Sequence, residues 1–262
     1  MSMTAKADWF ALSYKNEMTG DRCAERGFCT SVFFYDKLVA RQRISEGMKI
    51  IMGGLRRMEN RESNYEKVFF QFQEWFVQSP QESISEKIGA KIDENNLVLP
   101  FFGEICRICR DTGEIRGEGS REIPVTERLT IMHHLRYCKS FARIGSKMVP
   151  FREIKEAAVF ERAYEKAALE PLKKYFAGHP QKLLEAGLGM GGEQEKYGDV
   201  SITLHAFPKI KLTYIFWDGD DEFPPSANIL FEDTIAQWTH PESVPTLAQI
   251  GTERLIRILS GK

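Results

Sequence analysis

Four carboxylates lie within the five positions Asp218–Glu222, a segment that we call the acidic knot. Carboxylate oxygens are the ligands that Ca²⁺ and Mg²⁺ prefer in proteins. In an extended backbone Asp218, Asp220 and Glu222 would point to one side and Asp221 to the other. The spacing lacks the distant bidentate glutamate of a Ca²⁺-binding loop, and the Pro-Pro pair that follows is typical of a turn at a strand end. We favour a solvated turn, with a ligand or partner contact and a metal site as alternatives.

A metal-dependent enzyme would combine this knot with a histidine. His134 and Cys138 are four residues apart on a predicted helix, so they lie on one face and could hold a metal or share a hydrogen bond. His133 and His134 are adjacent, so their side chains diverge by about 100° and do not chelate one ion together. His205 lies on the polar side of a predicted strand. A structural role beside the apolar helix face is the interpretation that we favour for His134.

The segment CRIC, Cys106–Cys109, has the spacing of a zinc or redox pair. It falls inside a predicted strand, where residues three apart project from opposite faces. Zinc pairs need a tight knuckle, and redox pairs lie at a helix N-terminus. We therefore expect both cysteines to be small buried hydrophobic residues.

The glycine-rich segment GLGMGG, Gly187–Gly192, follows a predicted helix and leads to a predicted strand. Phosphate-binding loops have the reverse order, from a strand into a helix whose N-terminus faces the phosphate. A helix end followed by a connection is therefore favoured, although a glycine-rich loop near a sheet also lets a flat ligand approach the backbone. The candidate ligand contacts are Gly189, Gly191, Gly192, Trp217, Arg152 and Glu153.

Nucleophilic catalysis has little support in the pattern. No Gly-x-Ser-x-Gly elbow occurs, and no cysteine lies at an evident helix N-terminus. Arg152 and Glu153 follow a proline and could equally form a surface ion pair.

The elements that position these residues begin with two predicted helices. Ser63 opens a capping-box pattern before an amphipathic stretch with helical spacing. The next helix has Ser79 as its expected N-cap, Pro80 at its first position and Gly89 as its stop.

Strands and further helices follow in order. Leu97–Phe102 and Glu104–Arg110 are predicted strands joined by a short connection. A helix with Thr126 as its expected cap comes next. The Ala-rich stretch Glu156–Phe176 is also predicted to be helical, with Pro171 kinking or dividing it.

The last third of the chain returns to strands after a short predicted helix from Pro180 to Gly187. Alternating apolar residues predict a hairpin with Pro208 and Lys209 at its connection, and Ala227–Phe231 forms a third strand. A C-terminal helix closes the chain. Helices grouped before and after strands with short connections indicate an α+β fold, with a mainly antiparallel sheet packed against helices.

Composition fits one such domain with a partly helical N-terminal extension. Of the 262 residues, 42% are hydrophobic and 28% are charged, which is an ordinary globular balance. We place the extension at 1–62 and the single domain at 63–262. A net charge of −1 argues against nucleic acid as a partner. The absence of any membrane-spanning or signal-like window, and an odd number of cysteines, favour the cytoplasm and no membrane.

Several segments in sequence order resemble one known family. They are YEKVFFQFQEWFVQSPQESISEKIGAKIDENNLVLPFFGE, MHHLRYC, KMVPFREI, and GMGG followed by GDVSITLHAFPKIKLTYIFWDGDDEFPPSANILFEDT. Together they are similar to the bacterial and archaeal domain-of-unknown-function family 3786 over about residues 64–255. The most specific part runs from Phe207 to Glu232.

The resemblance implies no established activity. Some relatives carry an iron–sulfur module and belong to anaerobes with corrinoid-type one-carbon metabolism, which suggests a corrinoid or another metallocofactor as a ligand. The extension here has only Cys23 and Cys29, too few to ligate a four-cysteine cluster, so no iron–sulfur cluster is expected.

Three functions stay open at this point. The favoured one is a non-catalytic protein that binds a small molecule or metallocofactor between the sheet and the GLGMGG segment, or that serves as an accessory protein. The second is a metal-dependent enzyme that uses the acidic knot. The third is a protein-interaction module in which the knot and exposed aromatic residues dock a partner. The absence of catalytic motifs favours a binding protein over an enzyme.

Overall fold

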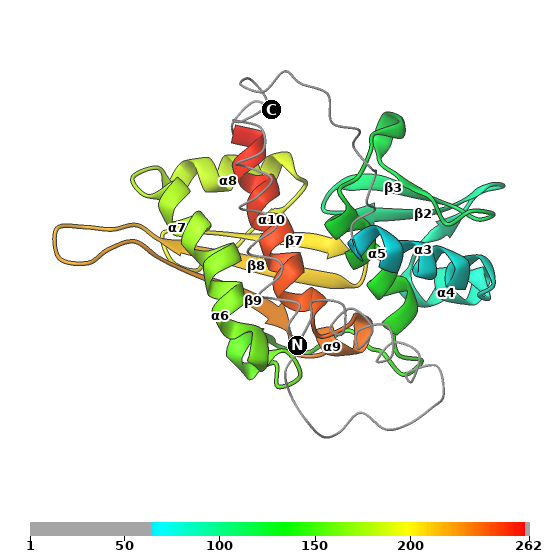
Figure 1. The fold of residues 1–262 in the computed structure, drawn as a ribbon. Helices are drawn as coiled ribbons and strands as arrows, with labels where there is room; N and C mark the ends of the chain where they lie inside the picture. The colour runs from blue at the N-terminus through cyan, green and yellow to red at the C-terminus, as the bar shows by residue number, and fades with distance from the viewer. Residues whose placement is uncertain (1–63, 260–262) are drawn as a thin grey trace, which may run out of the picture. The chain divides into compact units, whose positions relative to one another are not determined.

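Two antiparallel sheets organise residues 64–259, the part of the chain that the computed structural model describes. The expected extension at 1–62 and the Ser63 cap lie outside these residues. Figure 1 shows the smaller sheet beside helices α3, α4 and α5, and the larger sheet with α6, α7 and α10 over one face. The expected α+β class with antiparallel pairing is confirmed.

The first two helices form as predicted, with one difference in their capping. Helix α3 (Asn64–Val77) buries three phenylalanines on one face. Helix α4 (Gln81–Ile88) ends at Gly89, whose φ of 76° is the left-handed conformation that glycine adopts readily. The N-cap of α4 is the preceding proline and not Ser79. The Ser79 hydroxyl instead donates a 2.6 Å hydrogen bond to the Trp75 carbonyl at the end of α3.

The smaller sheet is a four-stranded antiparallel meander in the order β1-β2-β3-β4. Alternation along β2 buries Leu97, Leu99 and Phe101 on one face. The two long strands match the predicted ones to within a residue. The bounds of the four strands are Lys91–Ile92, Asn96–Phe101, Glu104–Cys109 and Ile115–Arg116.

Helix α5 (Val125–Tyr137) starts one residue before the expected cap, Thr126. Its N-cap is Pro124, and Thr126 lies inside the first turn, where its carbonyl accepts the Thr130 hydroxyl at 2.8 Å. The threonine therefore continues the helix instead of capping it. A short 3-10 helix, η1 (Glu118–Ser120), precedes α5.

The Ala-rich stretch is helical but not one continuous α-helix. Its pieces are the 3-10 helix η3 (Ala158–Phe160), α6 (Glu161–Tyr164), the π-helical turn η4 (Glu165–Leu169) and α7 (Glu170–Phe176). Pro171 is the second residue of α7 and follows backbone that is already helical, so the helical stretch changes from π to α where the proline has no N–H to donate to the preceding turn. The proline thus divides the stretch directly after the π-helical turn, in keeping with the prediction.

Helix α8 (Pro180–Gly189) runs two residues beyond its predicted stop. Gly187 does not end it. The residue is buried against β7, and a Cβ there would overlap the Ile202 side chain. The glycine therefore allows the helix to approach the sheet closely.

The larger sheet has the order β5-β9-β8-β7-β6 and is antiparallel throughout. Its central hairpin turns at Pro208 and Lys209, as predicted. Helices α9 (Ile235–Trp238) and α10 (Ser243–Leu259) follow the last strand. In chain order, β5 to β9 are Met148–Pro150, Glu193–Gln194, Val200–Phe207, Ile210–Trp217 and Ser226–Glu232.

Helix α10 closes the core over both sheets. The Tyr214 hydroxyl on β8 donates to the Ala248 carbonyl at 3.1 Å. Gly251 lies against Tyr214 and Phe102, where a Cβ would overlap the tyrosine hydroxyl. Within residues 64–259, no helix is long and apolar enough to cross a membrane.

Candidate functional site

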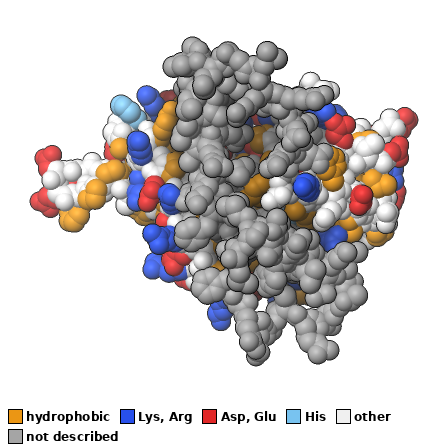
Figure 2. Space-filling model, viewed as in Figure 1, with side chains coloured by type: hydrophobic (Ala, Val, Ile, Leu, Met, Phe, Trp, Pro, Cys, Tyr) orange, Lys and Arg blue, Asp and Glu red, His pale blue; other side chains and the backbone are white. Residues whose placement is uncertain are grey.

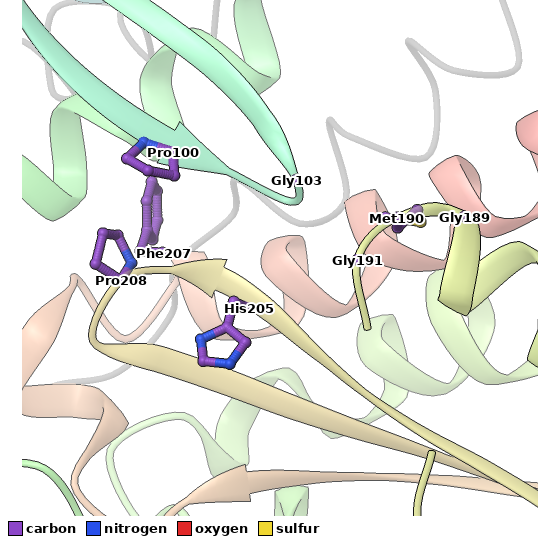
Figure 3. Close-up of a pocket in the computed structure, with 8 residues that line it drawn as sticks. All are labelled: Pro100, Gly103, Gly189, Met190, Gly191, His205, Phe207 and Pro208. Carbon is purple, nitrogen blue, oxygen red and sulfur yellow. The ribbon is translucent and has the colours of Figure 1, made fainter. Parts of the chain in front are cut away.

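A groove lies where the β2–β3 turn, the end of β7 and the loop after α8 meet (Figure 3). Its volume is about 430 Å³, within the range of small-molecule sites. His205 is the one titratable side chain of its lining. The lining residues are Pro100, Gly103, Gly189, Met190, Gly191, His205, Phe207 and Pro208.

The wall from the β2–β3 turn has an unusual backbone. Phe102 has a φ of 48°, a left-handed conformation that costs a residue with a Cβ about 1–2 kcal/mol. Its N–H donates to the Ala206 carbonyl of β7 at 3.1 Å and so joins the two sheets. Gly103 lies so close to the Met190 carbonyl that a Cβ would overlap it. The turn and the loop after α8 therefore contact each other through their backbones.

Arg254 on α10 holds the same turn from its buried side. Its guanidinium donates to the Phe101 carbonyl at 3.1 Å and lies 4.9 Å from the centroid of the Phe101 ring. It also forms ion pairs with Glu104 on β3 and with the buried Glu127 on α5. One buried cation thus ties α5, α10 and the β2–β3 hairpin together beneath the groove.

A β-bulge interrupts the pairing of β7 with β8 between His205 and Phe207. Bulges re-aim side chains and are common beside functional sites. Figure 3 shows that the two side chains diverge, although regular alternation would place them on one face. Phe207 stacks on Phe101, with ring centroids 4.8 Å apart, and on His134, with centroids 4.1 Å apart. The bulge therefore directs Phe207 to the core and leaves His205 at the groove.

The chemistry of the groove depends on the protonation of His205. Burial, and then the nearby charge of Lys211, lowers the pKa of His205 below its ordinary value, while Glu193 acts in the opposite direction. The imidazole is therefore neutral at pH 7. A neutral imidazole presents a lone pair on one ring nitrogen, which can accept a hydrogen bond or bind a metal ion.

The loop after α8 contributes glycines to the groove, so its backbone atoms are not covered by side chains. Gly189 and Gly191 line it, and Gly191 has a φ of 74°. Gly192 is not part of the lining and packs against β7, where a Cβ would overlap the Leu204 side chain. Two of the three expected glycine contacts therefore lie at the groove.

The other expected ligand contacts lie elsewhere. Trp217 ends β8, at the opposite end of that strand from the β7–β8 turn that borders the groove. Arg152 and Glu153 are exposed on the 3-10 helix η2 (Phe151–Glu153), which follows the edge strand β5. Strands β8 and β9 separate β5 from β7 in the sheet. The structure does not bring these three residues to the glycine loop.

The sequence does not predict that the β2–β3 turn lines the groove opposite the glycine loop. Pro100 and Gly103 come from the β2–β3 hairpin, far earlier in the chain than β7. The available signal was the Phe-Phe-Gly sequence that ends at Gly103, since a glycine after a strand marks a tight turn. The approach of this turn to Met190 is a tertiary contact, which no local pattern contains.

The acidic knot forms a turn in which two of its carboxylates accept hydrogen bonds from backbone N–H groups. The Asp220 carboxylate accepts the N–H groups of Glu222 at 2.9 Å and Phe223 at 2.8 Å. These hydrogen bonds lower the pKa of Asp220. The Asp218 carboxylate accepts the N–H of Gly178 at 2.9 Å. In Figure 1 the loop between β8 and β9 projects well beyond the sheet, at the left of the view.

The candidate metal ligands do not converge. Within residues 64–259, no three His, Cys, Asp or Glu side chains form a group that could hold a metal ion. His134 is buried with its Nδ1 2.8 Å from the Trp238 carbonyl. The Cys138 thiol is directed to the Lys139 carbonyl at 3.7 Å. Burial raises the pKa of Cys138 to about 11, so its thiol is neutral at pH 7.

Neighbouring pairs of such residues separate in the structure. His133 contacts Ser243 through Nδ1 at 2.7 Å, on a different side of α5 from His134. Cys106 is buried, and burial raises its pKa to about 12. Cys109, expected to be buried as well, is partly exposed, because β3 ends there and the chain turns. The CRIC cysteines therefore face different surroundings.

Comparison with known proteins gives one result that bears on this site. A family model described as "Domain of unknown function (DUF3786)" matches residues 81–254. The chain belongs to this family. The match includes every residue that lines the groove and all strands of both sheets. No curated protein and no solved structure matches the chain.

Proposed function

We propose that this DUF3786 protein binds a small molecule in the groove and acts as a binding or accessory protein without catalysing a reaction. The composition of the lining supports this. Pro100 and Pro208 offer apolar surface backed by the buried Phe207, the glycines offer backbone without side chains, and His205 is the single titratable side chain. A few polar groups in an apolar setting are typical of sites that orient a ligand. An acid–base pair would need a second titratable side chain, and the lining supplies none.

The groove suits a flat ligand in particular. Gly189 and Gly191 have no side chains, so a ligand can approach their backbone closely. Figure 3 shows the rings of Pro100 and Pro208 on the side away from the glycine loop. A planar molecule held there would have apolar rings at one end and peptide groups at the other, with His205 positioned to bond to its polar atoms.

A metallocofactor is one member of that ligand class. A neutral imidazole has one ring nitrogen with a free lone pair, which could bind the metal of such a cofactor. His205 would then hold the metal. A volume of about 430 Å³ lies towards the small end of the range for ligand sites, so the groove would contact one edge of a tetrapyrrole and leave the rest in solvent.

Calorimetric titration of the full chain with hydroxocobalamin and haemin tests whether the groove binds a metallocofactor. We expect binding, with at least about a tenfold loss of affinity in His205→Ala, which removes the only imidazole nitrogen among the lining side chains. His179→Ala is the matched control, because His179 is exposed and does not line the groove. If neither probe binds the wild-type protein, the metallocofactor version fails, and the search turns to organic ligands.

A further inference from the structure

Two exposed surfaces of opposite charge lie near the two ends of strand β9. The first is the segment Trp217–Pro225, which is the last residue of β8 and the loop that leads to β9, and which we call the acidic arm. The second is the segment between α5 and β5, Lys139–Lys147, which we call the basic loop. Neither surface contributes a residue to the groove.

The acidic arm combines negative charge with exposed aromatic surface. Figure 2 shows it as a projection with carboxylates at its tip and hydrophobic side chains beside them. Trp217 is 40% exposed and Phe223 67% exposed. The side chains of Asp221 and Glu222 are exposed between them. Large aromatic side chains exposed next to charges are typical of protein interfaces.

Backbone hydrogen bonds give the arm a defined shape. The Asp218 N–H donates to the Asp199 carboxylate at 2.7 Å, and the Asp220 N–H donates to the Phe223 carbonyl at 2.9 Å. A surface that is already ordered loses little conformational entropy when it binds.

The basic loop has the complementary composition. Phe141 is 69% exposed and Ile144 58% exposed. The side chains of Arg143 and Lys147 are also exposed, and within residues 64–259 neither forms an ion pair. The exposed Asp233, beside Gly145, offsets part of this positive charge.

The basic loop is fixed as firmly as the arm. The Trp238 indole N–H donates to the Arg143 carbonyl at 3.2 Å. The Lys139 N–H donates to the Gln237 carbonyl at 2.7 Å, and the Lys147 carbonyl accepts the Asp233 N–H at 3.0 Å. These bonds anchor the loop to α9 and to the end of β9, and direct its apolar side chains outward.

The two surfaces cannot meet within one molecule. The seven residues of β9 separate them by roughly 20 Å. The basic loop is hydrogen-bonded to α9, and Figure 1 shows α9 far from the projecting acidic arm. We propose that the acidic arm of one copy docks on the basic loop of a second copy. The carboxylates of Asp221 and Glu222 would pair with Arg143 and Lys147, and the aromatic side chains would cover Phe141.

This contact joins different surfaces of the two copies, so it is head-to-tail and can repeat. Because its ion pairs are exposed, each contributes little, and association weakens as salt screens them. The assembly is therefore a salt-sensitive ring or short chain of copies, and the surfaces that dock contain no residue of the groove.

Charge reversal tests the contact. The arm variant is Asp221→Lys with Glu222→Lys, and the loop variant is Arg143→Glu with Lys147→Glu. None of these four side chains has a hydrogen bond within residues 64–259 that the fold depends on, so both variants should fold. Sedimentation velocity of the full chain at low salt should show concentration-dependent association of the wild type, and at least about tenfold weaker association of each variant alone.

An equimolar mixture of the two variants tests whether the loss of association comes from this specific contact or from the changed net charge of the protein. In the mixture each reversed surface meets an opposite charge, so association should return to the wild-type range and fall again at high salt. The control, Lys67→Glu with Lys91→Glu, makes the same charge change as the loop variant, but at exposed lysines elsewhere, and should associate as the wild type does. A monomeric wild type, or a mixture that stays monomeric, overturns the proposal.

Discussion

Arg254 is a buried cation whose partners come from three other segments of the chain. With 3% of its side chain exposed, it cannot exchange those partners for water. Its removal leaves the Glu127 carboxylate buried without its charge partner, which is a costly arrangement. We predict that Arg254→Met lowers the free energy of unfolding by about 3–5 kcal/mol.

The matched control for this prediction is Arg107→Met. Arg107 forms an exposed ion pair with Asp93 at 3.2 Å, and such pairs contribute less than about 1 kcal/mol. Urea denaturation of both variants measures the difference. Equal losses in the two variants would show that the buried network does not hold the fold.

His134 makes the stability of the fold depend on pH. Burial lowers the pKa of His134 to about 4 in the folded chain, although the Trp238 carbonyl acts in the opposite direction. An unfolded chain protonates this histidine near pH 6.5, so the unfolded state binds more protons between pH 6.5 and pH 4. Stability is therefore full above pH 6.5 and decreases as the pH falls through that window.

We predict that His134→Phe reduces this pH dependence by about 1.4 kcal/mol per pH unit within the window. His133, with a pKa lowered to about 3 mainly by burial, contributes in both proteins and cancels in the comparison. Denaturation at a series of pH values measures the two slopes. Parallel slopes would mean that His134 is protonated in the folded state as readily as in the unfolded one.

At the scale of elements, the contact of α8 with the larger sheet depends on one glycine. A Cβ on Gly187 would overlap the Ile202 side chain, whereas a Cβ on Gly189 has its nearest neighbour, Ile258 Cγ2, at 3.9 Å. We predict that Gly187→Ala lowers the free energy of unfolding by about 1–3 kcal/mol, because the helix must move away from β7. Gly189→Ala should be neutral or slightly stabilising.

Thermal unfolding of the two alanine variants provides the measurement. Both glycines lie in α8, and replacing a helical glycine with alanine gains up to about 1 kcal/mol in helix propensity. The comparison of the two variants therefore reports mainly on packing against β7. Equal melting temperatures for both variants would contradict the close approach of α8 to β7.

The elements that sequence reasoning found are those with strong local patterns. The buried phenylalanines of α3 and the alternation in the β7–β8 hairpin identified these elements in advance. Helix caps were less predictable. The Ser79 hydroxyl donates to the Trp75 carbonyl at the end of α3 instead of capping α4, and Thr126 lies inside the first turn of α5, where its carbonyl accepts the Thr130 hydroxyl. Gly187 matches the pattern of a helix stop although α8 continues to Gly189, since close packing and a helix end favour the same residue.

At the scale of the whole molecule, the groove could be predicted only in part. The sequence predicts the glycine loop as a ligand contact and places His205 on the polar side of a strand, but it does not predict His205 as a ligand contact. The meeting of both with the β2–β3 turn depends on tertiary packing. The left-handed Phe102 has no sequence signal, because a phenylalanine does not favour that conformation. Trp217 is a predicted ligand contact, but the length of β8 keeps it away from the glycine loop.

The groove and the two charged surfaces share no residue, so ligand binding and self-association can be tested separately. The charge-reversal variants should keep the wild-type affinity for any ligand of the groove. His205→Ala should keep the wild-type association in sedimentation. A variant that loses both properties would indicate a general defect in folding, which circular dichroism would detect.

The most direct test of the ligand-binding role is the content of the protein purified anaerobically without chelator. An ultraviolet–visible spectrum, metal analysis and mass spectrometry of extracted small molecules would be compared for the wild type, His205→Ala and His179→Ala. We predict a stoichiometric ligand in the wild type and in His179→Ala, and its loss from His205→Ala. A wild-type protein without any bound molecule, or equal occupancy in all three proteins, would contradict a ligand site at the groove.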